Sequence, residues 1–490
     1  MEFYLILGVA TAVVSGLTVM MWHKTRCMAF PLGIAFMYFW TLYGGWRIVR
    51  SIDGTSDETP YLFYKVVPIF LNSDYMMALL LYTLFIIVVQ VTVLYLVAPK
   101  ERMRASRLIE ISHWRVAVMA AAAAVVGYLL IRNTLAEGAE ENLSGYGSVR
   151  SAALFTIYQV LDHAAMTLVT VGLAVCVSGR EPRYLGGKGN PRFVLLPYLA
   201  VFGALLYLCV KTGNRTEAAL AFALLVLFYS ANAQRASKLL IVGAGVFGAA
   251  TITAVKLIRD GFFSAANSVG LADLWTAASN EVLRSTENVA AHLSMYGVLH
   301  KQLPLTYGSS FVSLLFSFVP RMVWPNRPAP IYDDYVLGMA AIDGQGYTIH
   351  HATGWYMNFG IAGVIIGAVL IGWIWAGLFN LLYRKAEART WFGQILSAIG
   401  FWTFTSTIPM LLRNGPEVYK EVIMDCLLIP TALIAIAGTR LVKRYNRPCL
   451  IVARRPHAGG TSQRRVVSKA KSQESLAWRE ISPTDMQGAQ

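Results

Sequence analysis

The stretch Tyr75–Val97 reads YMMALLLYTLFIIVVQVTVLYLV and contains no charged side chain. As a helix it would be about 35 Å long, because each residue adds about 1.5 Å. That is enough to cross the hydrocarbon core of a bilayer, which is about 30 Å thick. A helix that is apolar on all sides belongs either in a membrane or in the core of a large protein. The rest of the chain decides between these two settings.

The composition of the whole chain is that of a membrane protein. Its 490 residues (54.0 kDa) are 56% hydrophobic and only 14% charged, with a mean hydropathy of +0.51. Soluble domains carry about 25% charged residues. Such a composition excludes a disordered chain, a coiled coil and a secreted disulfide scaffold. The five cysteines are scattered without a CxxC pair, so we expect neither a zinc site nor a disulfide framework.

Ten further apolar segments approach the roughly 20 residues that a spanning helix needs. Together they predict an all-α polytopic membrane protein with about eleven transmembrane helices and one large extracytoplasmic loop. We expect eight spans in residues 1–257, the large loop in 258–355, three spans in 356–438 and a basic tail in 439–490. The predicted spans are 3–22, 27–46, 75–97, 114–131, 152–178, 193–210, 216–232, 239–257, 356–383, 391–412 and 417–438.

The basic residues predict how the chain is oriented. The odd-numbered short loops hold fifteen Lys and Arg residues, whereas the four even-numbered short loops hold nine. Residues 440–490 add eleven basic and three acidic residues on the odd side. Cytoplasmic loops are the basic ones, so we expect the N-terminus in the periplasm and the C-terminus in the cytoplasm of a bacterial inner membrane. The net charge of +15 then marks orientation rather than nucleic-acid binding.

Two segments outside the bilayer have their own character. The tail lacks apolar periodicity, so we expect it to be disordered and to lie against anionic lipid headgroups, with a cytoplasmic regulatory partner as the alternative. In the large loop, residues 271–299 have the spacing of an amphipathic helix. The apolar stretch Phe311–Val319 is too short to span, and it predicts a helix at the outer membrane surface.

Three groups of arginines are expected at the outer ends of the spans. Arg215 and Glu217 follow a tight turn, Arg321 and Arg327 lie with Trp324 in a proline-rich stretch, and Arg413 precedes Gly415 and Pro416. A guanidinium group presents a planar pair of donors to a phosphate, and Trp324 can stack on a sugar. The alternatives are side chains that reach for lipid headgroups and, for the proline-rich stretch, a rigid cap over the bundle.

Several titratable residues are candidates for chemistry. His350, His351 and Asp333, with Asp334 competing for the same role, could act as a base or orient a hydroxyl group. Asp162 and His163 share one face of a predicted span with Gln159, which indicates a packing network first and a pathway second. The chain contains no nucleotide-binding or metallohydrolase motif, so we expect neither a cofactor nor a metal.

The order of these features resembles the O-antigen polymerase (Wzy-type) family of oligosaccharide repeat-unit polymerases. The resemblance covers most of residues 200–430, and elsewhere it is a resemblance of topology only. The matching stretches are Gly213 to Arg215, Tyr307 to Ser310, Pro320 to Pro328, Trp355 to Gly363, and Arg413 before the last span. Many members of the family carry Lys at the position of Arg327.

The resemblance implies a nucleotide-independent glycosyltransferase at the periplasmic face. Its substrate would be an oligosaccharide carried on undecaprenyl pyrophosphate, transferred from that lipid to the next lipid-linked repeat unit. On this basis Arg215, Arg321 and Arg413 would bind pyrophosphate, Arg327 would steer substrate, and His350, His351 or Asp333 would orient the acceptor. Trp324 and Glu217 would also contact the pyrophosphate or the glycan. Membrane lipid, a chain-length regulator and a flippase are the other partners that it suggests, for a polymer of O-antigen, capsule or exopolysaccharide type.

Two alternative functions remain open at this point. An O-antigen ligase-type enzyme has the same architecture and lipid donor but transfers the glycan to a lipid A core. A transporter of polysaccharide or lipid-linked sugar would need paired repeats and broken helices at the membrane midplane. The sequence shows no such internal symmetry, and its candidate residues gather at one surface.

Overall fold

The computed structural model describes residues 1–53, 69–98, 107–138, 153–178, 182, 184–188, 190–212, 215–233, 236–259, 286–316, 324, 326, 328, 330–339, 348–383 and 390–443. Nearly all of them are helical. The first part contains α1 (Glu2–Thr25), α2 (Ala29–Tyr38), the π-helix η1 (Phe39–Tyr43), α3 (Gly44–Ile52), α4 (Ser73–Leu96), α5 (His113–Gly138), α6 (Ala153–Val177), α7 (Pro191–Lys211), α8 (Arg215–Asn232) and α9 (Lys238–Arg259). The second part contains α12 (Thr286–His300), α13 (Ser309–Leu315), α14 (Ile331–Gly338), α15 (His351–Tyr383), α16 (Trp391–Ser406), α17 (Ile408–Arg413), the 3₁₀ turn η3 (Pro416–Val418), the π-helix η4 (Glu421–Leu428) and α18 (Ile429–Ile436).

Seven of these helices are long and apolar enough to cross a membrane, so the chain is a multi-pass helical membrane protein. The seven are α1, α4, α5, α6, α7, α9 and α15. The other four predicted spans also fall on helical segments, but these segments are short or interrupted. Residues 27–46 become α2, η1 and the start of α3, residues 216–232 become α8, and residues 391–438 become α16, α17, η3, η4 and α18.

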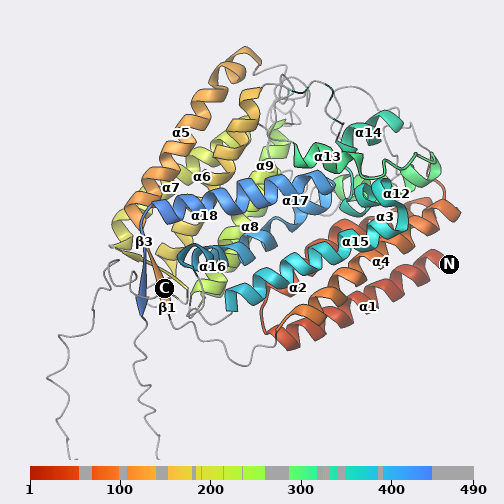
Figure 1. Ribbon diagram of the computed structural model, residues 1–490, viewed down its shortest axis with the longest axis horizontal. Helices are drawn as coiled ribbons and strands as arrows, with labels where there is room; N and C mark the ends of the chain where they lie inside the picture. Colours follow the sequence, from red (N-terminus) through yellow and green to blue (C-terminus); the bar gives the residue numbers. More distant parts are fainter. Residues whose placement is uncertain are drawn as a thin grey trace, which may run out of the picture.

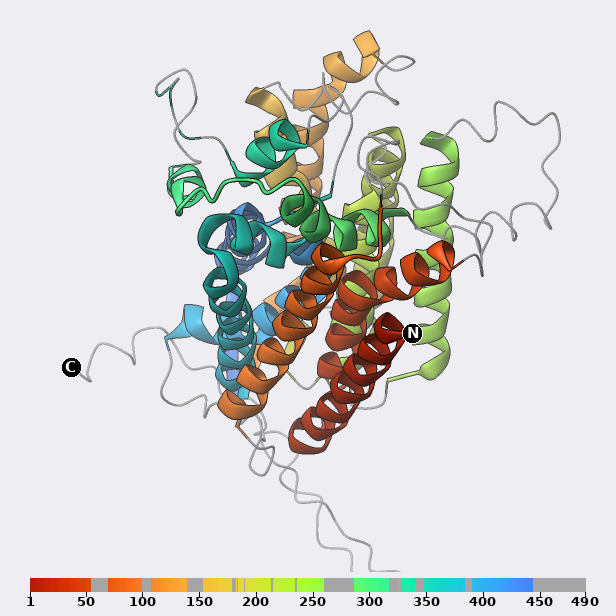
Figure 2. The same ribbon diagram turned by 90° about the vertical axis from the view of Figure 1, so that its right-hand side faces the viewer.

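The helices run back and forth between two ends of one bundle (Figure 1). One end carries a small sheet and is called the sheet end; the other carries α12, α13 and α14 and is called the α14 end. Figure 2 shows the green and teal helices of residues 286–338 gathered at the upper end of the bundle. Helices α1, α4 and α15 all finish at the sheet end, where Lys24 Nζ donates to Leu94 O (2.6 Å) and Asn380 Nδ2 donates to Leu96 O (2.8 Å).

The sheet at this end joins three strands that are far apart in the sequence. Its order is β2 (Leu185–Lys188), β1 (Arg107–Ser112), β3 (Thr439–Lys443). Strand β1 pairs in parallel with β2, where Ile109 faces Leu185, and antiparallel with β3, where Ile109 faces Leu441. The sequence reasoning did not predict these strands. It treated them as loop and tail because they lie in the basic segments between and after the predicted spans.

The described part of the large loop contains three helices, α12, α13 and α14, joined by non-helical residues such as 301–308. Helix α12 covers the second half of the amphipathic segment expected in 271–299, and the first half lies outside the described residues. Helix α13 overlaps the first part of the apolar stretch expected at the membrane surface, residues 311–319. The basic tail lies outside the described residues from position 444 onward.

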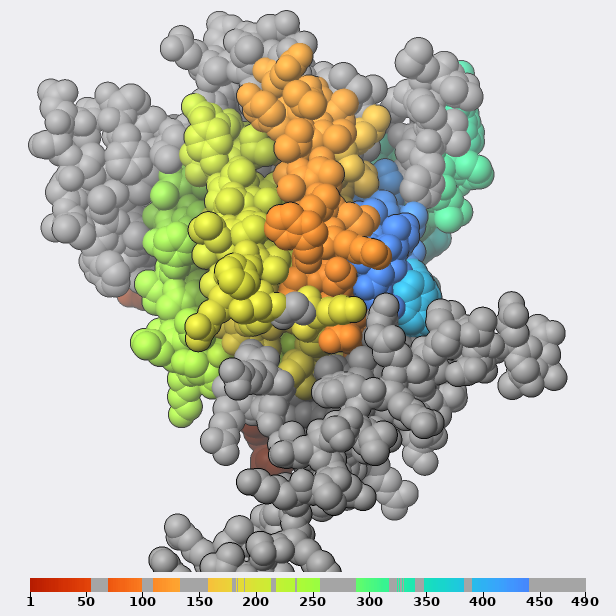
Figure 3. Space-filling view, turned by 90° about the vertical axis from the view of Figure 1, so that its left-hand side faces the viewer, coloured from red at the N-terminus to blue at the C-terminus, as the bar shows by residue number. Residues whose placement is uncertain are grey.

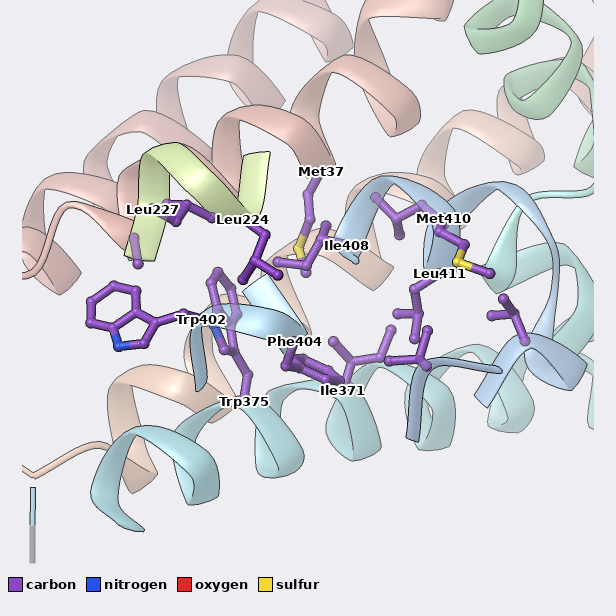
Figure 4. Close-up of a cluster of buried hydrophobic side chains, with 14 of the residues drawn as sticks. Met37, Leu224, Leu227, Ile371, Trp375, Trp402, Phe404, Ile408, Met410 and Leu411 are labelled. Atoms are coloured by element: carbon purple, nitrogen blue, oxygen red, sulfur yellow. The ribbon is translucent and has the colours of Figure 1, made fainter. Parts of the chain in front are cut away.

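The centre of the bundle is an apolar core built from α2, α8, α15, α16 and α17 (Figure 4). Trp375 of α15 is fully buried there, and its ring centroid lies 5.0 Å from that of Phe30. Its indole Nε1 donates to Thr405 Oγ1 (3.0 Å), so the one polar atom of the ring is satisfied. Gly33 of α2 gives the ring the space that it needs, because a Cβ atom there would lie 2.5 Å from the indole.

One face of the bundle is apolar and exposed. Helices α5, α7 and α9 form it in orange, yellow and light green, with blue α18 beside them (Figure 3). Phe193, Leu239 and Ile436 are 79%, 81% and 73% exposed on these elements. A contiguous apolar surface of this kind is unfavourable in water and favourable against lipid tails. It supports a membrane setting independently of helix length.

We predict that Gly33→Val destabilises the bundle, because overpacking a tight core costs about 1–3 kcal/mol. The variant should show a lower thermal unfolding midpoint than the unchanged protein when both are purified in the same detergent. Gly16→Val in α1 is the matched control, since nothing lies within 4 Å of a Cβ atom at that position. Equal midpoints for Gly33→Val and Gly16→Val would contradict the packing described here.

Candidate functional site

Four stretches that are distant in the sequence meet at the α14 end. They are residues 306–311 leading into α13, residues 330–335 of α14, residues 348–358 at the start of α15, and residues 413–419 around η3. We call this meeting point the junction. Asp333, Asp334, His350, His351 and Arg413, which the sequence singled out for chemistry, therefore lie on segments that meet in space.

A break in α15 helps to build the junction. Phe359 and Gly360 leave helical geometry, and Gly360 has a φ of 62°, which favours glycine. The preceding turn is held from outside, since Thr306 N donates to Met357 O (2.8 Å). Asn358 Oδ1 accepts from Thr306 Oγ1 (3.0 Å) and from Ser310 Oγ (2.9 Å). Non-helical backbone at membrane depth is tolerated when the protein supplies such partners.

His351 is completely buried, and its ring is held by three partners. Trp355 Nε1 donates to His351 Nε2 (3.0 Å), and an indole nitrogen can only donate. Nε2 is therefore an acceptor, and the proton of this neutral ring is on Nδ1, which donates to Gly415 O (3.0 Å). Tyr419 Oη lies 3.0 Å from Nε2. The ring fastens the start of α15 to the η3 turn.

His350 is equally buried and is held in the opposite tautomer. The backbone N of Ala352 donates to His350 Nδ1 (3.1 Å), so the ring proton is on Nε2, which donates to Thr41 Oγ1 (3.0 Å). Burial, with His351 and His292 nearby, keeps the pKa of His350 well below its usual value. Thr41 lies in the π-helix η1, and its carbonyl oxygen accepts from His292 Nδ1 (2.8 Å).

Neither histidine is open to a substrate in this conformation, because both rings have every nitrogen engaged. Their role as a base or as an orienting group stays a prediction. What the structure describes is a pair of rings that join η1, α15 and η3.

The carboxyl groups of the junction are more accessible. Asp333 is exposed on the first turn of α14, and Asp334 beside it is partly buried. Burial and the neighbouring charge of Asp333 raise the pKa of Asp334. Glu417 lies in the η3 turn, outside the seven candidate spans, and its Oε1 accepts from Ile331 N (2.8 Å). Burial raises the pKa of Glu417 to about 7, although the Ile331 amide opposes this shift.

The predicted arginines are described to different extents. Arg413 is partly exposed at the end of α17, next to the bridge between Asn414 and Ile349. Trp324 is partly buried against Phe316, with ring centroids 5.3 Å apart. Arg321, Arg327 and the side chain of Arg215 lie outside what the structure describes.

Glu217 is not part of the junction. It is 2% exposed on the first turn of α8, where its Oε1 lies 3.1 Å from His163 Nε2. It is close enough to Glu421 of η4 for the two charges to interact. Since Glu421 follows Glu417 by one turn, the beginning of α8 lies near the junction. The expected contact of Glu217 with substrate stays a prediction.

No protein-family model, curated protein or solved structure matches this chain. Its chemistry has to be inferred from the site itself.

Glu417 is the residue that sequence reasoning missed. A carboxylic acid with a pKa near 7 can both donate and accept a proton at neutral pH, which is what a general acid or base requires. The available signal was an acidic residue directly after the Gly415–Pro416 turn. What the sequence could not give was its partner, because Ile331 is 86 positions away. The junction thus combines the exposed carboxylate of Asp333, the carboxyl group of Glu417 with its raised pKa, and the guanidinium group of Arg413.

We predict that His351→Ala destabilises the protein, because it leaves the Gly415 carbonyl and the Trp355 indole without their partner. Unsatisfied buried groups cost about 1–3 kcal/mol each, so a loss of about 2–4 kcal/mol is expected. Thermal or denaturant unfolding in detergent would measure it. His23→Ala is the control, since His23 is exposed at the end of α1. If both variants unfold alike, His351 does not fasten α15 to η3.

We predict that the contribution of Glu417 to stability falls as the pH rises from about 5 to about 7, whereas the lowered pKa of buried His350 acts in the opposite direction. The pKa of Glu417 is about 4.5 when unfolded and about 7 when folded, so the folded state retains a proton that the unfolded state loses. Glu417 contributes at most about 3 kcal/mol to the free energy of unfolding. This contribution is lost by about pH 7, and above that pH it no longer changes. Asp334 acts in the same direction as Glu417.

Glu417→Gln should remove this contribution from the stability profile. Unfolding midpoints between pH 5 and pH 8 would show the difference, with Glu2→Gln as the exposed control. Parallel profiles for Glu417→Gln and the unchanged protein are the outcome that speaks against a raised pKa.

Proposed function

We propose that this chain is a membrane glycosyltransferase that joins lipid-linked oligosaccharide repeat units, with undecaprenyl pyrophosphate as the leaving group. The proposal rests on its resemblance to the Wzy-type polymerases. The observation that carries it is convergence: the stretches 307–310 and 355–363 and residue Arg413, which bear the resemblance, meet in the junction.

The proposed chemistry needs few groups from the protein. A hydroxyl group of the acceptor repeat attacks the anomeric carbon of the donor, and the bond to the pyrophosphate oxygen breaks. The proton of that hydroxyl passes to a carboxylate, for which the exposed Asp333 and the more buried Glu417 are the candidates. Charge that develops on the pyrophosphate would be stabilised by Arg413, Arg215 and Arg321. The donor is already activated, so neither nucleotide nor cofactor is required.

The proposed setting is the periplasmic face of a bacterial inner membrane. The alternation of the helices supports it: the chain starts at the α14 end and the described part finishes in β3 at the sheet end. Together with the basic loops, this favours a cytoplasmic sheet end and a periplasmic junction. A lipid-linked substrate would reach the junction from the bilayer beside it.

The ligase-type alternative uses the same donor and would use the same junction. The glycan that accumulates when the protein is lost separates the two. Single repeat units on the carrier indicate a lost polymerase, and long chains on the carrier indicate a lost ligase.

We predict that Arg413→Ala, Arg215→Ala and Arg321→Ala each abolish long polymer when the purified protein is incubated with undecaprenyl-pyrophosphate-linked repeat units. Loss of one charge-assisted contact to a leaving group costs about 2–4 kcal/mol, which is a rate decrease of about 10²–10³-fold. A ladder on a gel measures the product. Arg192→Ala is the control, since Arg192 is exposed at the sheet end.

Normal ladders from all three well-folded variants would show that these arginines do not bind the leaving group. A purified protein that moves lipid-linked units across liposomes without forming any ladder would favour the transporter instead.

A further inference from the structure

A second cluster of reactive side chains lies where α6, α7 and α8 meet, away from the junction. It consists of Asp162 and His163 on α6, Cys209 on α7 and Glu217 on α8, and none of them is more than 3% exposed. One potential ligand atom from each of Asp162, Cys209 and Glu217 lies within 4.8 Å of the other two. A carboxylate, a thiol and a second carboxylate therefore point at one small volume inside the protein.

The hydrogen bonding of this cluster is incomplete. By hydrogen-bond geometry neither carboxylate oxygen of Asp162 has a partner among the described residues, and neither does Nδ1 of His163. The carboxyl group of Glu217 is close to Asp162, but the two can share a hydrogen bond only when one of them carries a proton. A buried polar group without a partner costs about 1–3 kcal/mol, and a buried charge costs more. The native fold would not keep Asp162 in this position unless something else compensates for it.

The side chains around the cluster also include more acidic than basic groups. Glu421 and Asp425 of η4 interact electrostatically with His163, and Glu421 also interacts with Glu217. The basic groups that face these carboxyl groups among the described side chains are His163 and Lys420. An excess of acidic groups in a buried volume favours a bound cation.

We propose that Asp162, Cys209 and Glu217 bind a transition-metal ion of the zinc class. A thiolate is a soft ligand that zinc accepts and that calcium and magnesium avoid. Zinc bonds of about 2.0–2.3 Å to oxygen and sulfur need the three ligand atoms within about 4 Å of one another. In the described structure they lie within 4.8 Å of one another, so binding requires a closer approach of the three side chains.

His163, the fourth residue of the cluster, supports the metal ligands. His163 Nε2 lies 3.1 Å from Glu217 Oε1, so it orients that carboxylate for the metal. The ligands supply three of the four tetrahedral positions, which leaves one for water. Binding releases the proton of the Cys209 thiol to solvent, so affinity should rise with pH.

The site does not depend on the proposed function. It would tie three helices together and fix the beginning of α8, whose first residue is Arg215. Its presence can be measured without any glycan substrate.

The test uses the full-length protein in detergent, stripped with a chelator and then dialysed against Zn²⁺ or Co²⁺. Elemental analysis should give about one zinc per chain, and Co²⁺ should give the intense thiolate-to-cobalt absorption of a sulfur ligand. Cys209→Ser should lose that absorption. Asp162→Asn and Glu217→Gln, which keep the size of the side chain, should each weaken zinc binding at least 10-fold.

Cys176→Ser is the matched control. Its thiol lies 3.7 Å from His113 Nδ1, so it is the other described cysteine with a nitrogen ligand close by. This variant should bind zinc and cobalt as the unchanged protein does. Loss of the cobalt absorption in Cys176→Ser, but not in Cys209→Ser, would overturn the assignment.

The unchanged protein alone can also refute the proposal. Less than about one tenth of a zinc per chain after dialysis overturns it, and so does cobalt binding without a sulfur absorption. In that case a proton shared by Asp162 and Glu217 is the explanation, and Asp162→Asn should then raise the unfolding midpoint. These outcomes differ from failure of the proposed function, which would leave metal binding intact.

Discussion

Inside a bilayer every peptide N–H and C=O group must find its partner within the protein, because lipid offers none. Most of this chain meets the requirement with uninterrupted helices. Two of the interruptions, the π-helix η1 and the break in α15, lie toward the α14 end. The Thr41 carbonyl accepts from His292, and the Met357 carbonyl accepts from Thr306. Thr306 belongs to the junction and His292 lies near His350 of the junction, so this constraint shapes the junction.

Much of the helical fold could be predicted from composition and periodicity. Each of the eleven predicted spans falls on helical residues, because runs of apolar side chains are a strong local signal. The sheet could not be predicted this way. Strand β2 has four residues, and its partner β1 begins 78 positions earlier, so no local pattern announces the pairing. The interruptions of α2–α3 and α15 were also invisible, since they depend on partners from other elements.

The candidate site could likewise be predicted only in part. The sequence identified the right regions, because charged residues in an apolar chain are conspicuous. It could not say that His350 and His351 are buried, since that depends on Thr41 and Gly415 from distant segments. It read Glu217 as facing outward, whereas the side chain lies against His163. The burial of Glu417 and its bond to the Ile331 amide are visible only in the structure. Residue type can be read locally, but environment is a property of the tertiary structure.

The pairing of β3 with β1 has a consequence for biosynthesis. Strand β1 is synthesised early, before helices α5 to α18. Its antiparallel partner β3 is synthesised more than 300 residues later. Throughout translation one edge of β1 therefore has no strand to bind. The third strand can pair only after α18 has been made, so the sheet is completed after the helices of the bundle. A chain that ends before position 439 would leave that edge of β1 unpaired and able to bind other proteins or quality-control proteases.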